Sequence, residues 1–389
     1  MAKVAHREPS IFAITLVLVL SALAGCQQDA AREVEDVAGA PPASAVIQVF
    51  EPGLPAGSVS KPGYVEVTTY YGTDREPGDL SPSMPAVTQA ANRYSGRRAK
   101  LGELRFGEAK VSIPFIHQIG ELEERFLRRD DPTASVVLLN VNERARADWV
   151  GELRRQLQAS NASAALIYVH GYNVDFREAA RRCAQLAYDL QFSGVPMFFS
   201  WPSRGITTAY PVDEATVEWS TPHLAEFLRT AIVESDVQNV FIIAHSMGAR
   251  ATSRALEALT RTNPSMMARI RAVIFAAPDI DADVFQAEIL PAFSAATRVT
   301  LYASNEDDAI KASTFLHDYP RAGGVGVATP NVISIDASNV DTSFIGHSYY
   351  GDSKIVIKDI AELMRGLAPD ARSGIQRYGS IWRFKDAAP

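Results

Sequence analysis

The stretch Val240–Gly248, which reads V-F-I-I-A-H-S-M-G, constrains the fold of this 389-residue chain more than any other part. Its first five residues form a short apolar run, which is typical of a strand buried on both faces of a sheet. Small and apolar residues at helical spacing follow Gly248, so the chain turns sharply from a strand into a helix. A serine at such a turn is typical of a catalytic nucleophile, usually in the pattern G-x-S-x-G, and here Ala244 replaces the first glycine. We therefore expect Ser246 to carry backbone strain at a strand-to-helix turn.

Strand and helix patterns alternate on both sides of this stretch, which predicts an α/β fold with a mostly parallel sheet covered by helices on both faces. Earlier strands, near residues 64–71, 111–114 and 136–141, can pair antiparallel at one edge. No internal repeat is present, and one domain fits the pattern. The predicted later strands are 164–169, 196–201, 240–244, 272–276, 298–302 and 332–335, with helices near 176–190, 215–233 and 355–367.

The N-terminal segment has the pattern of a secretory signal peptide. Lys3 and Arg7 precede the apolar run Ile11–Leu20, which is too short to span a bilayer as a mature helix. The ending L-A-G-C resembles the bacterial lipobox, and this resemblance implies that Cys26 becomes the lipidated first residue after cleavage. Residues 1–25 are then the signal peptide; the alternative is a plain signal-anchor helix.

Lipidation of Cys26 would attach the protein to a membrane of the cell envelope. By analogy with lipoprotein sorting in Gram-negative cells, Gln27 after the cysteine favours the outer membrane, with the protein facing the periplasm. Residues 26–62 are rich in Ala, Pro, Gly and acidic residues and are expected to form a flexible tether, so that the domain comprises residues 63–389. Cys183 is then the one remaining cysteine, and its place in an apolar helical stripe predicts a buried core thiol.

The composition excludes several classes of protein. Hydrophobic residues make up 47% and charged residues 21% of the chain, as in ordinary globular proteins. The net charge of −7 and the lack of a basic run argue against a nucleic-acid partner. No sequence pattern typical of a metal site or a phosphate-binding loop is present, so we expect neither a metal nor a cofactor.

A nucleophilic serine needs a base, and the base needs an orienting acid. After a serine on such a turn, the acid and then the histidine follow along the chain, each at the carboxyl end of a strand. His317 and His347 are the histidines that follow Ser246. His347 lies in a loop between the last predicted strand and the final helix and is the predicted base. His317 falls on a predicted helix and is expected to be structural.

The acid has several candidates. Asp307 follows the strand 298–302 directly and is our choice, with Asp308 as its neighbour. Asp279 and Asp281 follow the preceding strand and remain alternatives, because some hydrolases place the acid there.

An oxyanion needs two main-chain N–H groups directed at it. One is expected from Met247, the residue after the nucleophile, and the second from Tyr172, in a loop where a strand ends in His170-Gly171. His170 is expected to hydrogen-bond within this loop rather than act as a base. Trp201 ends a strand at the same edge and either lines a pocket or belongs to the core.

From about Tyr64 to Leu367 the chain resembles an uncharacterised bacterial family of the α/β-hydrolase (esterase/lipase) superfamily. This resemblance implies hydrolysis of a small-molecule or lipid ester, without naming the ester, and leaves the oligomeric state open. The alternatives are a lipase, thioesterase or amidase acting on an envelope substrate, or a non-catalytic envelope-binding lipoprotein. The matching stretches are residues 71–75 (YGTDR), 111–114 (VSIP), 167–173 (IYVHGYN), 200–203 (SWPS), 244–248 (AHSMG), 277–281 (APDID) and 346–350 (GHSYY).

Overall fold

A computed structural model describes residues 50–100, 103–123, 130–160, 163–293, 297–324, 332–340 and 353–385. All of these residues belong to the compact unit Pro41–Pro389, which is distinct from a unit Met1–Ala40. The predicted lipidation site, Cys26, and the predicted base, His347, lie outside the described residues.

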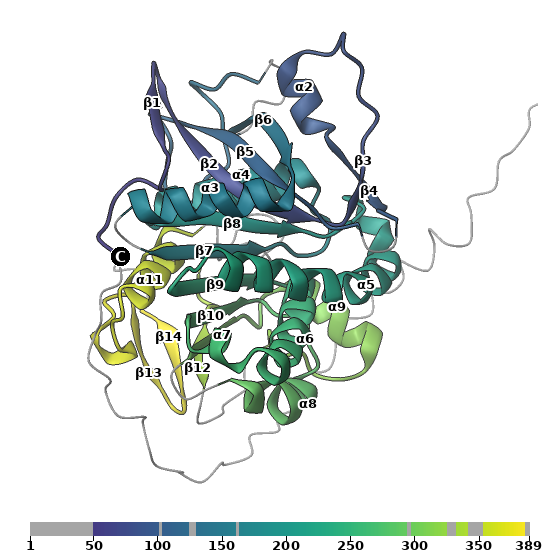
Figure 1. Ribbon diagram of the computed structural model, residues 1–389. Helices are drawn as coiled ribbons and strands as arrows, with labels where there is room; N and C mark the ends of the chain where they lie inside the picture. Colours follow the sequence, from purple (N-terminus) through teal and green to yellow (C-terminus); the bar gives the residue numbers. More distant parts are fainter. Residues whose placement is uncertain are drawn as a thin grey trace, which may run out of the picture. The chain divides into compact units, whose positions relative to one another are not determined.

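Twelve of the described strands form one mixed sheet in the order β13-β14-β12-β11-β10-β9-β7-β8-β2-β5-β6, with β1 paired to β2 (Figure 1). The strands from β2 through β8, β7, β9, β10, β11 and β12 to β14 run parallel, as predicted. Antiparallel pairing is confined to β1, β5 and β6 at one edge and to β13 at the other. The strands are β1 (Val59–Lys61), β2 (Tyr64–Thr73), β5 (Arg105–Pro114), β6 (Val137–Arg144), β7 (Ala164–Val169), β8 (Val195–Ser200), β9 (Asn239–His245), β10 (Ile270–Ala276), β11 (Arg298–Ala303), β12 (Val332–Asp336), β13 (Ile375–Tyr378) and β14 (Ile381–Phe384), and β3 (Arg75–Pro77) and β4 (Tyr94–Arg98) form a separate pair.

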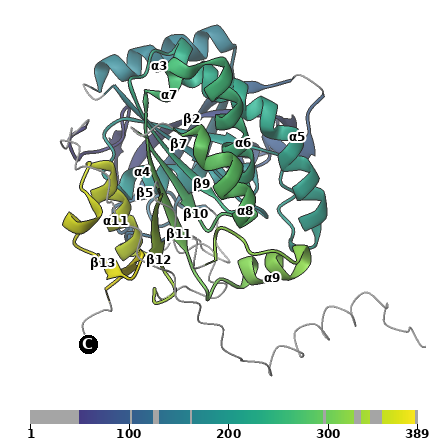
Figure 2. The ribbon, with the colours of Figure 1, turned by 90° about the horizontal axis from the view of Figure 1, so that it is seen from below.

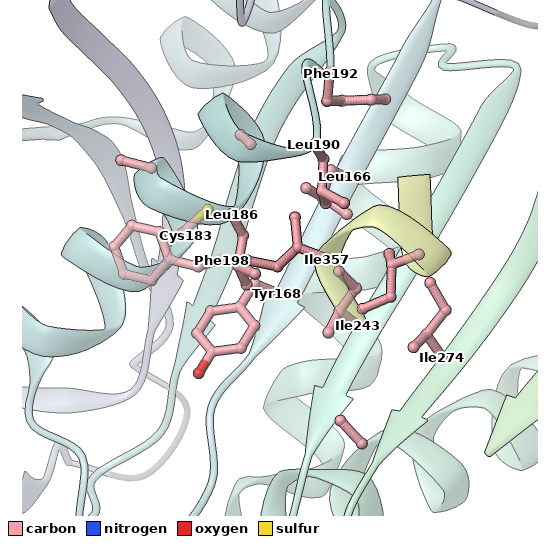
Figure 3. Close-up of a cluster of buried hydrophobic side chains, with 14 of the residues drawn as sticks. Leu166, Tyr168, Cys183, Leu186, Leu190, Phe192, Phe198, Ile243, Ile274 and Ile357 are labelled. Carbon is pink, nitrogen blue, oxygen red and sulfur yellow. The ribbon is translucent and has the colours of Figure 1, made fainter. Parts of the chain in front are cut away.

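Helices cover both faces of the sheet because successive side chains of a strand point to opposite faces (Figure 2). Leu166 and Tyr168 of β7 pack in one core with α4 and α11, and Figure 3 shows them beside Cys183 and Ile357 from these helices. Ile167 and its β7 neighbours on the other face pack in a second core with α3, α5 and α6. The helices are α2 (Ala86–Ala91), α3 (Arg146–Ala159), α4 (Phe176–Asp189), α5 (Tyr210–Arg229), α6 (Met247–Thr262), α7 (Pro264–Met267), α8 (Ala282–Val284), α9 (Asp308–His317) and α11 (Lys354–Met364).

The prediction of a core thiol at Cys183 is confirmed. The side chain is fully buried on α4, and its sulfur lies 3.3 Å from the carbonyl oxygen of Met197. Burial in these apolar surroundings raises the pKa of the thiol well above its usual range, so that the thiolate is disfavoured.

The domain begins earlier than residue 63. The Phe50 ring is buried and makes edge-on contacts with Phe192 at 4.9 Å and Phe241 at 5.8 Å between centroids. Farther along, β1 adds a short antiparallel strand to β2. Residues 50–62, which we expected within the flexible tether, therefore pack as part of the domain, because burial of an aromatic ring outweighs a composition that is otherwise typical of a linker.

Two other regions also hold more structure than their sequence predicts. The C-terminal strands β13 and β14 form a hairpin around Gly379, which has a φ of +57°. Residues 76–100, for which we predicted no strand or helix, contain α2 and β4. These elements are four to six residues long, too short for a hydrophobic period to appear in the sequence.

Candidate active site

Ser246 lies between β9 and α6 with φ of 50° and ψ of −124°, so the predicted backbone strain is present. A strained conformation of this kind costs about 1–3 kcal/mol and persists only where its surroundings hold it. Here the Ser246 N–H donates to the Ala276 carbonyl at 2.9 Å, and the Ser246 carbonyl accepts from the Asp279 N–H at 3.2 Å. The end of β10 therefore fixes the turn, and Ser246 stays 4% exposed at the carboxyl edge of the sheet.

The loop after β7 lies directly against this turn. A methyl group built on Gly171 would lie 2.7 Å from His245 Nδ1 and 2.9 Å from Ser246 Cβ. A methyl group on Gly248 would lie 2.2 Å from the His170 carbonyl oxygen. Both positions therefore need glycine, and this close contact brings the main chain at Gly171 beside Ser246, as the oxyanion prediction requires.

The two predicted oxyanion donors flank Ser246 on different segments. Met247 is the first residue of α6, where the main-chain N–H groups have no acceptor within the helix. Tyr172 follows Gly171 in the loop after β7. The Tyr172 hydroxyl donates to the Thr207 carbonyl, which ties this loop to the segment between β8 and α5.

His170 is a structural residue, as predicted. Burial, together with the charge of Arg75, lowers the pKa of His170 to about 3, so the imidazole is neutral at ordinary pH. Trp201, for which pocket and core roles were both open, belongs to the core. It is fully buried, its Nε1–H donates to the His170 carbonyl at 2.8 Å, and the two rings stack with centroids 5.0 Å apart.

Arg75 is the main feature of the site that the sequence analysis did not identify. Its side chain is completely buried and contacts His170 and Val174 in the loop after β7. Its N–H groups donate to Ser200 Oγ at 2.8 Å, to the Ser203 carbonyl at 3.0 Å and to the Val174 carbonyl at 2.8 Å. The available signal was an arginine two residues after the end of β2, but nothing in the sequence shows which loops it contacts.

Asp307 lies at the carboxyl edge of the sheet, just after β11, where the predicted acid should be. It is fully buried, and its Oδ1 accepts from the N–H groups of Ala309 and Ile310 at 3.0 Å each, so Asp307 caps α9. Asp308 is exposed and pairs with Lys311, in contrast to its neighbour. Asp307 as the acid stays a prediction, because His347 lies outside the described residues.

Asp279, the main alternative, is occupied by a different set of contacts. Its Oδ2 accepts from the Tyr210 hydroxyl at 2.6 Å and from Arg250 at 3.0 Å. Its Oδ1 accepts from the Ser313 hydroxyl at 2.5 Å and lies 3.4 Å from Arg321. Burial raises the pKa of Asp279, but Arg250 and these hydrogen bonds outweigh burial and lower it overall. Asp281 caps α8 through the N–H groups of two following residues.

These contacts of Asp279 belong to a polar network that joins three helices at the rim of the site. Arg250 on α6 pairs with Glu214 on α5 at 2.5 Å, and the same Glu214 oxygen lies 2.8 Å from Nε2 of His317 on α9. His317 is thus engaged with α5, in keeping with the structural role predicted for it. Tyr210 of the same network makes an edge-on ring contact with Tyr172 at 5.4 Å.

A cavity of about 680 Å³ lies at the amino ends of β7 and β9, away from Ser246, and is lined by residues that include Ser163, Asp236 and Gln238.

Among the described residues, no group of three or more His, Cys, Asp or Glu side chains is arranged to hold a metal ion. No helix in the described part of the chain is long and apolar enough to cross a membrane.

Similar proteins have been solved, though at low similarity. The carboxylesterase EstE1 from a metagenomic library is 10% identical, over 58% of this chain and 99% of EstE1, with a TM-score of 0.29. A Trichoderma reesei cutinase in complex with a phosphonate inhibitor is 10% identical (57% and 90% coverage, TM-score 0.30). A lipase-esterase related protein from Clostridium acetobutylicum is 11% identical (54% and 96% coverage, TM-score 0.30). Such scores carry no argument by themselves, and no curated protein has a significantly similar sequence.

The family assignment rests instead on a family model together with the strand order and the turn at Ser246. Residues 145–365, more than half of the chain, match the model described as "Alpha/beta hydrolase of unknown function (DUF900)". The matched range contains the turn at Ser246, the loop after β7 and the candidate acids. The chain belongs to this alpha/beta hydrolase family and has the α/β-hydrolase fold.

Proposed function

We propose that the protein is a serine carboxylesterase in which Ser246 is the nucleophile, His347 the base and Asp307 the orienting acid. The observation that carries this proposal is the strained turn at Ser246, against which the main chain of Gly171 is packed. In this proposal the main-chain N–H groups of Tyr172 and Met247 stabilise the oxyanion.

The reaction follows from these roles. Ser246 Oγ forms a bond to the acyl carbonyl carbon while His347 takes its proton, and the carbonyl oxygen becomes the oxyanion. His347 then gives the proton to the alcohol as the ester bond breaks, leaving an acyl group on Ser246. Water, deprotonated by His347, releases the acid and restores the serine. No cofactor takes part in any of these steps.

A fluorophosphonate probe, which reacts with activated serines, tests the proposal. We expect labelling of the wild-type protein at Ser246 and hydrolysis of nitrophenyl esters, and loss of both in Ser246→Ala. Ser253→Ala is the matched control, because Ser253 is also buried and lies on α6, the helix that follows Ser246. A folded wild-type protein that is not labelled at Ser246 would overturn the proposal.

A lipase acting on apolar acyl chains is the second candidate. Large apolar side chains are exposed on the segments that carry the rim of the site: Ile206 before α5, and Phe315 and Leu316 on α9. Such side chains suit an apolar substrate or interface. Activity that rises with acyl length and with micelle formation would support a lipase, and activity confined to short soluble esters would support an esterase.

We also propose that Cys26 is lipidated and attaches the enzyme to the outer membrane, facing the periplasm. The support is the L-A-G-C ending of the signal-like segment, with glutamine at position 27. Metabolic labelling with a radioactive fatty acid should mark the wild-type protein and not Cys26→Ser. Labelling of Cys26→Ser, or release of the wild-type protein in soluble form, would contradict the proposal.

A further inference from the structure

The buried side chain of His170 has partners that leave it a single proton position. Its Nδ1 lies 2.8 Å from the carbonyl oxygen of Gly171, which can only accept a hydrogen bond. Its Nε2 lies 3.4 Å from Arg75, whose guanidinium can only donate. The proton is therefore on Nδ1, and Nε2 is the acceptor. Ser200 Oγ, also 3.4 Å from Nε2, can donate to the same lone pair.

This hydrogen bond acts on the peptide group that contains the proposed oxyanion donor. The Gly171 carbonyl and the Tyr172 N–H belong to one planar peptide, so fixing the direction of the carbonyl fixes the direction of the N–H. Donation to the carbonyl oxygen also polarises the peptide, which strengthens the N–H as a donor by about 10–30% in energy. The site therefore has a means of orienting Tyr172 N–H before a substrate arrives.

Arg75 holds the imidazole of His170 and the loop after β7 in place. It is fully buried, and besides His170 it contacts Ser95, Ser200, Ser203 and Val174. Because Arg75 joins the carbonyl of Val174 to the imidazole, it fixes both ends of the loop after β7. The charge of Arg75 also disfavours a second proton on His170.

We propose that Arg75 and His170 are positioning residues that orient and polarise the Gly171–Tyr172 peptide, so that the Tyr172 N–H binds the oxyanion during ester hydrolysis. This inference rests on the proposed esterase function. Neither residue contacts the substrate; each acts through the main chain of the loop. We call the contacts from Arg75 through His170 to the Gly171 carbonyl the relay. Loss of the relay should weaken binding of the transition state and leave binding of the ground-state ester unchanged.

His170→Phe tests the relay, because phenylalanine keeps the ring that stacks on Trp201 and removes both nitrogens. We expect kcat for a nitrophenyl ester to fall about 10–100-fold, since loss of a complete oxyanion donor costs about 10²–10³. KM should stay within about threefold. A trifluoromethyl ketone, which forms an oxyanion adduct with an active serine, should lose affinity by the same factor as kcat, and the matching methyl ketone should not.

His117→Phe is the matched control. The side chain of His117 is only 3% exposed and has two partners, Glu123 and Asp189, but it lies near the C-terminal end of α4, away from Ser246. It should leave kcat and the affinity for the trifluoromethyl ketone within about twofold of the wild type. An equal fall in kcat in both variants, or an unchanged kcat in His170→Phe, would overturn the proposed relay.

The wild-type protein provides a test that does not depend on how a variant folds. Nitrogen-15 NMR of the imidazole should show His170 with its proton on Nδ1 and no protonation down to pH 5. A proton on Nε2 would contradict the proposal. If the fluorophosphonate probe fails to label wild-type Ser246, the esterase function itself fails; if it labels Ser246 but His170→Phe has full activity, the relay alone fails.

Discussion

At the scale of single residues, two carboxylates that follow neighbouring strands differ in what surrounds them. Asp307 caps α9 at the carboxyl end of β11. Both oxygens of Asp279 are engaged by Tyr210, Arg250 and Ser313 at the rim of the site. These contacts give Asp279 a structural role, and Asp307 stays our prediction for the acid that orients the histidine.

Asp307→Asn should therefore abolish activity without unfolding the protein. The asparagine carbonyl oxygen can still accept from Ala309 and Ile310, so the cap is kept while the charge is lost. We expect kcat to fall about 10⁴-fold, as for a triad Asp→Asn. Ester hydrolysis and thermal unfolding measured on the same sample test this, and a kcat within a few-fold of the wild type would show that the acid lies elsewhere.

Asp279→Asn should mainly reduce stability. The variant removes the buried pair of Asp279 with Arg250 and leaves Glu214 as the carboxylate paired with Arg250, so we expect a cost of up to about 3 kcal/mol. Urea unfolding should show this loss, with kcat of the remaining folded protein within about tenfold of the wild type. A kcat lowered by several orders of magnitude at unchanged stability would reverse the roles of the two carboxylates.

Protonation of His170 makes stability depend on pH. Its pKa is about 3 in the folded protein and about 6.5 in an unfolded chain, so the unfolded state binds the extra proton between these values. Through His170, the free energy of unfolding should therefore fall by about 1.4 kcal/mol for each pH unit below 6.5. Urea unfolding between pH 7 and pH 4 should show a steeper decline for the wild type than for His170→Phe. Parallel curves would contradict a neutral buried His170.

Gly171→Ala tests the contact between the loop and the turn. The added methyl group would collide with His245 and with Ser246 Cβ, so the loop must move away from the nucleophile. A displacement of about 1 Å in an active site can cost 10²-fold in rate, and we expect a fall of at least that size in kcat/KM. Activity near that of the wild type would show that the loop is not held against Ser246.

At the scale of the elements, those with long regular patterns were predictable and those that depend on contacts were not. The prediction for α4 was close, because a capping residue, Asp175, precedes a continuous apolar stripe. By contrast, α3 starts at Arg146 without a side-chain cap, and Asp148 lies in its first turn. The hairpin of β13 and β14 forms because the buried side chains of Ile375 and Phe384 pack in the core formed with α11, which short strands alone do not reveal.

Gly151→Ala offers a prediction for α3. Gly151 lies within the helix, and a methyl group built there has no atom within 4 Å. Since glycine in a helix is about 0.5–1 kcal/mol less favourable than alanine, the variant should be more stable by about that amount. Urea unfolding measures this, and full esterase activity in the variant would make it a fitting control for Gly171→Ala. A destabilised variant would contradict the open space at this position.

At the scale of the whole molecule, the domain boundary depends on aromatic burial. A chain that begins at Phe50 should unfold at the same urea concentration as one that begins at residue 27. A chain that begins at Tyr64 loses the Phe50 contacts and β1, and should be less stable by at least about 3 kcal/mol, the usual cost of removing one buried phenylalanine side chain. Equal stability of all three chains would restore residue 63 as the boundary.

The sequence by itself determined the order of the longer strands and helices of the parallel sheet, the serine at a strained turn and the His170-Gly171 loop. Each of these follows from a local pattern: an apolar run, a helical period or a small residue at a close approach. Only the tertiary structure determined which partners the buried charged side chains contact. Arg75 reaches His170 across 95 positions of the chain, and Asp279 meets Ser313 across 34. A buried charge is stable only with partners, and these partners come from distant segments that no local pattern brings together.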